Sequence, residues 1–80
     1  MTPEKLEKLV ASNILASRKA RGWTQDQFAK RLKKPASWLN RLENGKAVPT
    51  LATLALAAKV LKCEPWDLLR DEWSQAKRSK

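Results

Sequence analysis

Apolar residues near the start of the chain recur at spacings of three and four, a period typical of one face of an amphipathic helix. The positions on this face are Leu6, Leu9, Val10, Ile14 and Ser17. Thr2 suits an N-cap, Pro3 suits the first helical position, and Glu4 adds an acid to the first turn. Gly22 is well placed to end the helix. The pattern therefore predicts a first helix from Pro3 to about Ala20.

Two shorter helices are predicted between Gly22 and Gly45. Thr24 and Gln27 have the spacing of a capping box at the start of the first of them. Pro35 fits the start of the second better than its interior. Their inward stripes are Phe28, Ala29 and Leu32 in the first, and Leu39 and Leu42 in the second. Two short helices joined by a polar turn are the outline of a helix-turn-helix, in which the second helix enters the DNA major groove and the first crosses the backbone.

Two more helices are predicted in the remainder. Thr50 is the expected cap of a fourth helix. The buried face of that helix is predicted to comprise Leu51, Leu54, Ala55, Ala58 and Leu61. Glu64-Pro65 begins a fifth helix, which carries Trp66, Leu69 and Trp73. Because a polar, basic chain end tends to fray, residues 1–76 are predicted to form one domain and residues 77–80 a basic tail. The predicted fold class is all-α, with five helices.

Length and composition fit a small domain of ordinary apolar content, with 80 residues of which 42% are hydrophobic. The single cysteine, Cys63, cannot form an internal disulfide, which favours a reducing compartment. Charges interrupt the first residues, unlike a signal peptide, and no apolar run approaches the roughly 20 residues of a membrane span. We therefore expect a cytoplasmic protein with no membrane contact.

The charge is basic and unevenly placed. Seventeen Lys and Arg against eight Asp and Glu give a net charge of +9. Residues 1–17 are balanced, whereas residues 18–46 contain nine basic and two acidic residues, a balance of +7. Lys30, Arg31, Lys33 and Lys34 cluster around the predicted turn. This distribution is typical of a protein that binds a polyanion, although a basic solvated face would have the same composition.

The order and spacing of these elements resemble the lambda-repressor/Cro-type (XRE-family) helix-turn-helix proteins. The resemblance covers residues 14 to about 69 and implies the five-helix fold of that family. Two positions depart from the family pattern: Lys33 replaces a turn glycine, and Pro35 replaces a Ser or Thr cap. A left-handed backbone at Lys33 would cost about 1–2 kcal/mol. The matching elements are Arg18, Gly22 to Gln25, Phe28-Ala29, Ser37 to Lys46, Pro49 and the leucine-rich residues 51–61.

The resemblance also implies roles for individual residues. Gln25, beside the cap Thr24, would bind a phosphate at the helix N-terminus. Arg18 and Glu43 would form a structural salt bridge. The groove-facing side of the third helix would comprise Ala36, Ser37, Asn40 and Arg41, with Asn44, Lys46 and the turn residue Lys34 near the phosphate backbone.

Side-chain chemistry leaves alternatives at several of these positions. Arg41 suits bidentate readout of guanine, worth about 1–3 kcal/mol of discrimination, or a phosphate contact. Ser37 and Asn40 suit base edges or phosphates equally. Trp38 would pack on the sugar-phosphate chain or on the second helix. Trp73 would extend the core or form a dimer contact. Trp23, Trp66 and Cys63 are expected in the core.

The sequence argues against an enzyme, because the chain has no His, no Cys pair and no glycine-rich phosphate loop. No cofactor, metal or small-molecule ligand is expected. The sequence favours a sequence-specific transcriptional regulator, a repressor or autoregulator that binds a palindromic operator on double-stranded DNA as a homodimer. Two alternatives are an antitoxin that binds both its operator and a toxin protein, and a protein-interaction or RNA-binding adaptor.

Overall fold

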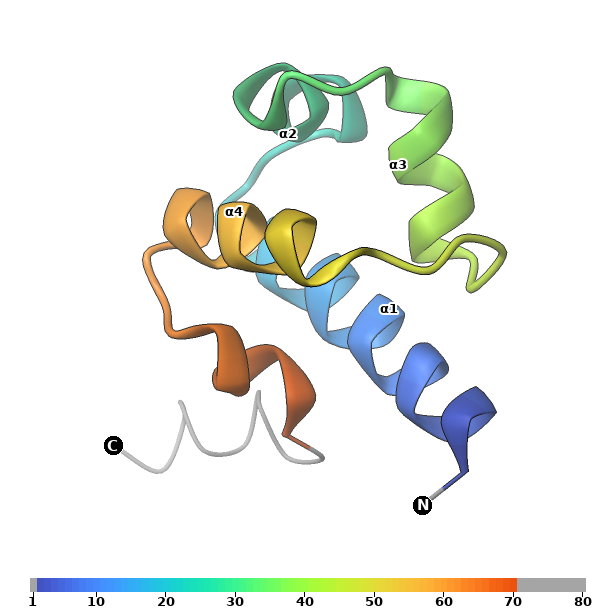
Figure 1. Ribbon diagram of the computed structural model, residues 1–80. Coiled ribbons are helices and arrows are strands. Elements are labelled where there is room, and N and C mark those ends of the chain that lie inside the picture. The colour runs from blue at the N-terminus through green and yellow to red at the C-terminus, as the bar shows by residue number, and fades with distance from the viewer. Residues whose placement is uncertain (1, 71–80) are drawn as a thin grey trace.

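The computed structural model describes residues 2–70, and within them every regular element is helical (Figure 1). Its elements in chain order are α1 (Pro3–Ala20), α2 (Gln25–Leu32), α3 (Ala36–Glu43), α4 (Leu51–Leu61) and η1 (Pro65–Leu69). The all-α prediction is confirmed, but the five-helix count is not. In place of the predicted fifth α-helix, the described part of the chain has a single 3-10 segment of five residues.

Threonine caps begin three of the four α-helices, as predicted. The hydroxyl of Thr2 accepts from the Lys5 N–H at 3.2 Å, and that of Thr50 accepts from Thr53 at 3.1 Å. At α2 the cap is reciprocal, since Thr24 Oγ1 accepts from the Gln27 N–H and Gln27 Oε1 accepts from the Thr24 N–H. These bonds satisfy N–H groups that have no acceptor within the helix, so each start is defined locally.

All four α-helices end in the same way, with one residue in the left-handed region. These residues are Gly22, Lys33, Gly45 and Lys62, with φ between 58° and 74°. In each case the N–H of the following residue bonds back to a carbonyl five residues earlier, as from Lys34 to Ala29 at 3.0 Å. Lys33 therefore adopts the left-handed conformation at the turn position where the resemblance implies glycine, and Lys62 repeats it at the end of α4.

The core lies where α1, α2, α3, α4 and η1 converge. The helices pack in the pairs α2 on α3, α1 on α3, and η1 on both α1 and α4. Most of the predicted inward residues are buried, which confirms the faces of α2 and α3. The buried apolar residues that had been predicted are Val10, Ile14, Phe28, Ala29, Leu32, Leu39, Leu42, Leu54, Ala58 and Leu61.

Three predicted inward positions on the longer helices are wrong. Leu51 is 84% exposed, Ala55 is exposed, and Ala57 is buried in their stead. Only Thr53 and Lys59 are polar in α4, so the apolar pattern there does not distinguish one face from another. Leu6, in the second turn of α1, is also exposed.

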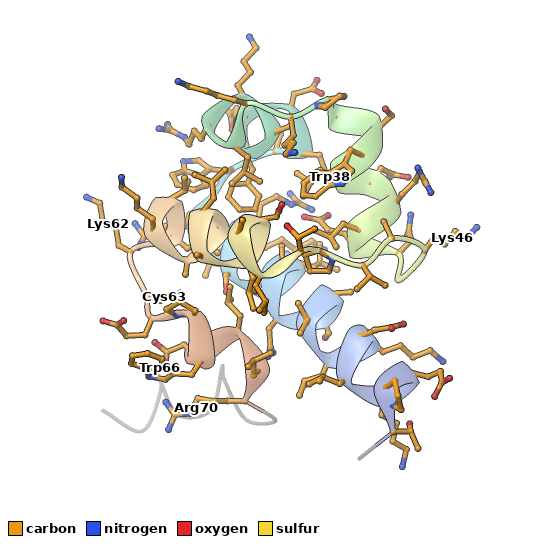
Figure 2. The ribbon with its side chains drawn as sticks, in the orientation of Figure 1. Trp38, Lys46, Lys62, Cys63, Trp66 and Arg70 are labelled. Atoms are coloured by element: carbon orange, nitrogen blue, oxygen red, sulfur yellow. The ribbon has the colours of Figure 1, made fainter. Side chains whose placement is uncertain are left out.

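The prediction for η1 is wrong in a related way. Trp66 is 63% exposed and Leu69 is also exposed, whereas Leu68 is fully buried. Figure 2 shows Trp66 at the side of the molecule, among the residues of η1. A 3-10 helix has three residues per turn, so the side chain that meets the core is not the one an α-helical period selects. Trp73 and the predicted basic tail lie outside the described residues.

A buried amide attaches η1 to α1. Asn13 Nδ2 donates to the carbonyl oxygens of Leu68 at 2.8 Å and Arg70 at 2.9 Å, across more than 50 residues of sequence. Ser17, also buried, donates to the Asn13 carbonyl. Within residues 2–70, no helix is both long enough and apolar enough to cross a membrane.

Candidate nucleic-acid interface

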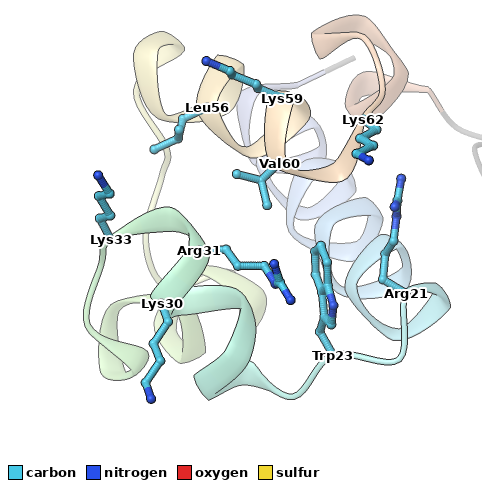
Figure 3. Close-up of a pocket in the computed structure, with 9 residues that line it drawn as sticks. All are labelled: Arg21, Trp23, Lys30, Arg31, Lys33, Leu56, Lys59, Val60 and Lys62. Atoms are coloured by element: carbon cyan, nitrogen blue, oxygen red, sulfur yellow. The ribbon is translucent and has the colours of Figure 1, made fainter.

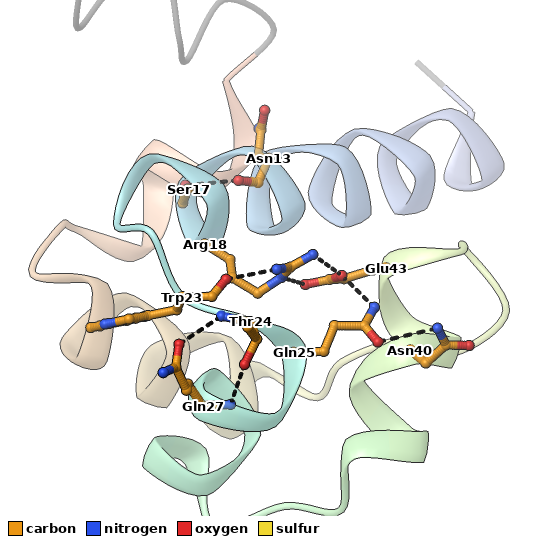
Figure 4. Close-up of polar contacts among 9 residues, drawn as sticks. All are labelled: Asn13, Ser17, Arg18, Trp23, Thr24, Gln25, Gln27, Asn40 and Glu43. Carbon is orange, nitrogen blue, oxygen red and sulfur yellow. Dashed lines mark hydrogen bonds and ion pairs between the residues drawn. The ribbon is translucent and has the colours of Figure 1, made fainter.

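The α2–α3 unit is attached to α1 by a buried salt bridge. Arg18 Nε lies 2.7 Å from Glu43 Oε2, and Arg18 Nη2 lies 3.0 Å from Glu43 Oε1. The side chains are 9% and 2% exposed. A third guanidinium N–H donates to the Trp23 carbonyl at 2.8 Å. The bidentate geometry fixes the C-terminal end of α3 on α1, as Figure 4 shows.

Gln25 joins this salt bridge from the first position of α2. Its Nε2 donates to Glu43 Oε1 at 2.8 Å, and its Oε1 accepts from Asn40 Nδ2 at 3.3 Å. Asn44 Nδ2 in turn donates to Asn40 Oδ1 at 3.1 Å. The chain of hydrogen bonds therefore runs from buried Arg18 to the exposed surface of α3 (Figure 4).

The hydrogen bonds of Gln25 orient α2 relative to α3. An amide has two N–H donors and two acceptor lone pairs, and each side of the Gln25 amide is engaged by one of these contacts. The remaining N–H stays available to an incoming acceptor such as a phosphate oxygen. Gln25 is half-buried, beside the C-terminal half of α3.

The outward face of α3 is polar. Ser37, Asn40 and Arg41 are exposed, whereas Leu39, Leu42 and Glu43 are buried. Asn44 and Lys46 are exposed beyond the end of the helix, and Thr24 is exposed at the start of α2. Most of the predicted contact residues are thus accessible on the α2–α3 unit or just beyond it.

The aromatic and small residues of α3 lie at its edge. Trp38 and Ala36 are half-buried and pack against the core. Lys34 Nζ lies 5.4 Å from the centre of the Trp38 ring, within the range of a cation–π contact. Of the two positions considered for Trp38, the structure shows packing against the core, with the Trp38 and Lys46 side chains on α3 and just beyond it in Figure 2.

Trp23, predicted in the core, packs against the core from its edge. It is half-buried and stacks on Phe28, with ring centroids 5.7 Å apart. The Arg31 guanidinium lies over the same ring at 4.4 Å. One of the basic residues around the turn is therefore directed toward Trp23, in the loop that follows α1. Cys63 is half-buried and packs against the core, in agreement with expectation.

The contacts that could not be predicted from the sequence join residues far apart along the chain. Asn13 gave no signal, because its partners are carbonyls more than 50 positions away. The Gln25–Glu43 and Gln25–Asn40 bonds span 18 and 15 positions. Within the described residues, every buried side-chain nitrogen or oxygen has at least one hydrogen-bond partner.

Two short helices, a left-handed turn between them, and an exposed polar second helix define the class of helix-turn-helix proteins. Residues 14–67 match the family model described as HTH_3, Helix-turn-helix. The chain belongs to the HTH_3 helix-turn-helix family. This confirms the predicted resemblance to lambda-repressor/Cro-type proteins.

The chain is also similar to several solved structures. A hypothetical transcription factor NHTF from Neisseria superposes with a TM-score of 0.81 at 20% identity, over 98% of this chain and 91% of that one. An HTH_3 family transcriptional regulator from Vibrio cholerae gives 0.81 at 24% identity, over 92% of this chain but 42% of that one. The SinR protein/SinI protein complex superposes with a TM-score of 0.70 at 22% identity, over 88% of this chain and 76% of that one. At these identities the likeness establishes the fold. The comparison with curated proteins finds no match.

Proposed function

We propose that this protein is a sequence-specific, DNA-binding transcriptional regulator of the cytoplasm that acts as a homodimer on a palindromic operator. The observation that carries the proposal is the division of α3. Its exposed side is polar and basic, while its buried side is fixed to α1 through Glu43 and Arg18. A rigid helix with an accessible polar face meets the geometric requirement for entry into the major groove.

Within this proposal the side chains divide into two groups. Gln25 binds a phosphate at the N-terminus of α2, where Thr24 already caps the backbone. Arg41 reads a base pair through two guanidinium donors, with Ser37 and Asn40 at neighbouring bases or phosphates. Lys34, Asn44 and Lys46 contribute contacts to the backbone. Ala36 lies at the groove-facing side of α3, and Trp38, which packs against the core, lies beside it.

An apolar surface supports the proposed homodimer. Several large apolar side chains are exposed around a groove of about 230 Å³ between the N-terminal half of α1, the start of α4 and the end of η1. These side chains are Leu6, Val48, Leu51 and Leu69. Clustered apolar exposure favours an interface, and Trp73, four residues after Leu69, is the proposed additional dimer contact. A dimer would place two recognition helices on half-sites about 34–36 Å apart.

The test is selection of binding sites from random duplex DNA with the full chain, together with its mass in solution. The expected result is one enriched motif with two-fold symmetry and a dimeric mass on DNA. Absence of an enriched motif would overturn the proposal. In the same assay Arg41→Ala should lose preference at one base pair, whereas Gln25→Ala should weaken all sites alike, because phosphate contacts carry no sequence information.

Binding to a protein partner is a second candidate. The SinR structure was solved as a complex with the SinI protein, so a chain of this fold is compatible with a bound protein. An antitoxin would form a stable complex with the product of an adjacent gene, and an adaptor would show salt-dependent nucleic-acid binding without a motif. Co-purification with that gene product, alongside the selection experiment, separates these outcomes.

A further inference from the structure

A basic groove is lined by residues other than those proposed to contact DNA. It has a volume of about 660 Å³ and is formed by α2, α4 and the chain just after α1 (Figure 3). We call it the basic groove. None of the residues proposed to contact DNA lines it. Its lining comprises Arg21, Trp23, Lys30, Arg31, Lys33, Leu56, Lys59, Val60 and Lys62.

The charge of the basic groove is of one sign. Six of its nine described lining residues are Lys or Arg, and none is acidic. Part of this charge has a structural explanation, since Arg21 Nη2 donates to the Leu61 carbonyl at the end of α4. Arg31 is stacked on Trp23. Within the described residues, no hydrogen bond or salt bridge engages the ammonium groups of Lys33, Lys59 or Lys62.

The helix ends at the groove do not neutralise it. Lys33 and Lys62 are the C-caps of α2 and α4, so two helix C-termini reach the groove. Each C-terminus has a partial charge of roughly −0.5, which is small beside six full positive charges. A strongly positive concave surface of this kind attracts an acidic partner and accelerates its association.

The floor of the groove is aliphatic. Leu56 and Val60 lie one turn apart on α4, and Leu56 is 36% exposed. Trp23 is already stacked by Phe28 and covered by Arg31, so a nucleobase would have to displace Arg31 in order to stack there. A phosphate backbone has no group to place against Leu56 and Val60. A peptide has both carboxylates for the rim and apolar side chains for the floor.

We propose that the basic groove binds an acidic, leucine-containing segment of a partner protein. The segment lies along the groove with its apolar side chains on Leu56 and Val60 and its carboxylates at Lys33, Lys59 and Lys62. This site is separate from the DNA-contacting face of α3, so DNA and the partner segment bind at the same time.

The probe is a fluorescein-labelled peptide of Glu, Asp and Leu. About eight extended residues span roughly 26 Å, close to the 28 Å second dimension of the molecule. A peptide of equal charge with Ser in place of Leu is the matched control. Binding to the full chain is followed by fluorescence anisotropy at physiological ionic strength, where the Debye length is about 8 Å, and is mapped by amide chemical shifts.

Two double variants have the same change in net charge. Lys59→Glu with Lys62→Glu reverses charge in the groove, whereas Lys5→Glu with Lys8→Glu reverses it on α1 away from the groove. The groove variant should weaken binding by about tenfold or more, and the control variant by less than about threefold, because distant charges are screened. Leu56→Ser should lower affinity for the Leu peptide to that for the Ser peptide.

Several outcomes would overturn the proposal. These are no binding of either peptide, equal losses in the two double variants, equal affinity for the Leu and Ser peptides, or shifts that map to α3. An oligonucleotide of equal charge that shifts the groove residues more strongly than the peptide would assign the groove to nucleic acid instead. Arg41→Ala should leave peptide binding unchanged, so failure at this site is distinguishable from failure of the DNA-binding proposal.

Discussion

The buried pair Arg18–Glu43 predicts a large and specific loss of stability when one partner is removed. Replacing Glu43 by Leu leaves the Arg18 guanidinium nine-tenths buried, with the Trp23 carbonyl as its remaining protein acceptor. It also removes the acceptor of Gln25. An uncompensated buried charge costs about 3–5 kcal/mol. The two charge-assisted bonds, at about 1.5–3 kcal/mol each, give a similar magnitude.

This loss is large relative to the total free energy of unfolding. A chain of 80 residues at about 0.05–0.15 kcal/mol per residue has a free energy of unfolding of roughly 4–12 kcal/mol. Glu43→Leu therefore removes a quarter or more of it. Glu43→Gln, which keeps a neutral acceptor opposite Arg18, is expected to lose less, so at least one variant stays folded. Stability is measured by urea unfolding monitored with far-UV circular dichroism.

The double variant Arg18→Met with Glu43→Leu is the decisive comparison. Removing both charges eliminates the stranded ion, so the double variant should be more stable than the sum of the single losses predicts, by about 0.5–3 kcal/mol. The reasoning is refuted if each single variant loses less than about 1 kcal/mol, as an exposed pair would. It is also refuted if the two losses simply add.

Three further substitutions have defined expectations in the same unfolding assay. Thr24→Ala should cost about 1 kcal/mol through loss of the α2 cap, with Thr24→Ser near wild type. Lys33→Gly should stabilise by up to about 1.5 kcal/mol, because it removes a left-handed penalty of about 1–2 kcal/mol and adds a glycine entropy cost of about 0.5–1 kcal/mol; a loss of stability would contradict this. Asn13→Ala should cost about 1–3 kcal/mol by leaving the Leu68 carbonyl unsatisfied, and hydrogen exchange should accelerate first in η1 if the anchor is local.

Sequence reasoning succeeded where the determinant is local. The caps at Thr2, Thr24 and Thr50 depend on residues within three positions, and each was recognisable without tertiary information. The buried stripes of α2 and α3 were also predictable, because polar residues interrupt the apolar ones there and the helical period selects one face.

Prediction from sequence failed where polar residues do not interrupt the apolar ones, and where the helix has a period other than that of an α-helix. Nearly every residue of α4 is apolar, so Leu51 could not be distinguished from Ala57 by periodicity, although only Ala57 is buried. In η1 an α-helical period favours Trp66 and Leu69, whereas the observed 3-10 turn buries Leu68. The carbonyl contacts of Asn13 that anchor this turn are set by tertiary packing.

At the candidate interface, sequence resemblance supplied the residue types but not their internal partners. It placed Gln25 and Asn40 on the DNA side, but nothing in the chain indicated that they bond to each other and to Glu43. These contacts depend on the angle between α2 and α3, which is a property of packing and not of either helix alone. The basic groove is likewise formed only when α2 and α4 meet.

The division of α3 has a consequence for how such a protein could change its target. The inward residues of this helix, Leu39, Leu42 and Glu43, are buried, whereas Ser37 and Arg41 are exposed and take no part in the core. Substitutions at the two exposed positions should therefore alter the preferred operator with little effect on stability. If α3 reads DNA as proposed, new binding specificities are accessible by single substitutions, and the scaffold that presents them stays intact.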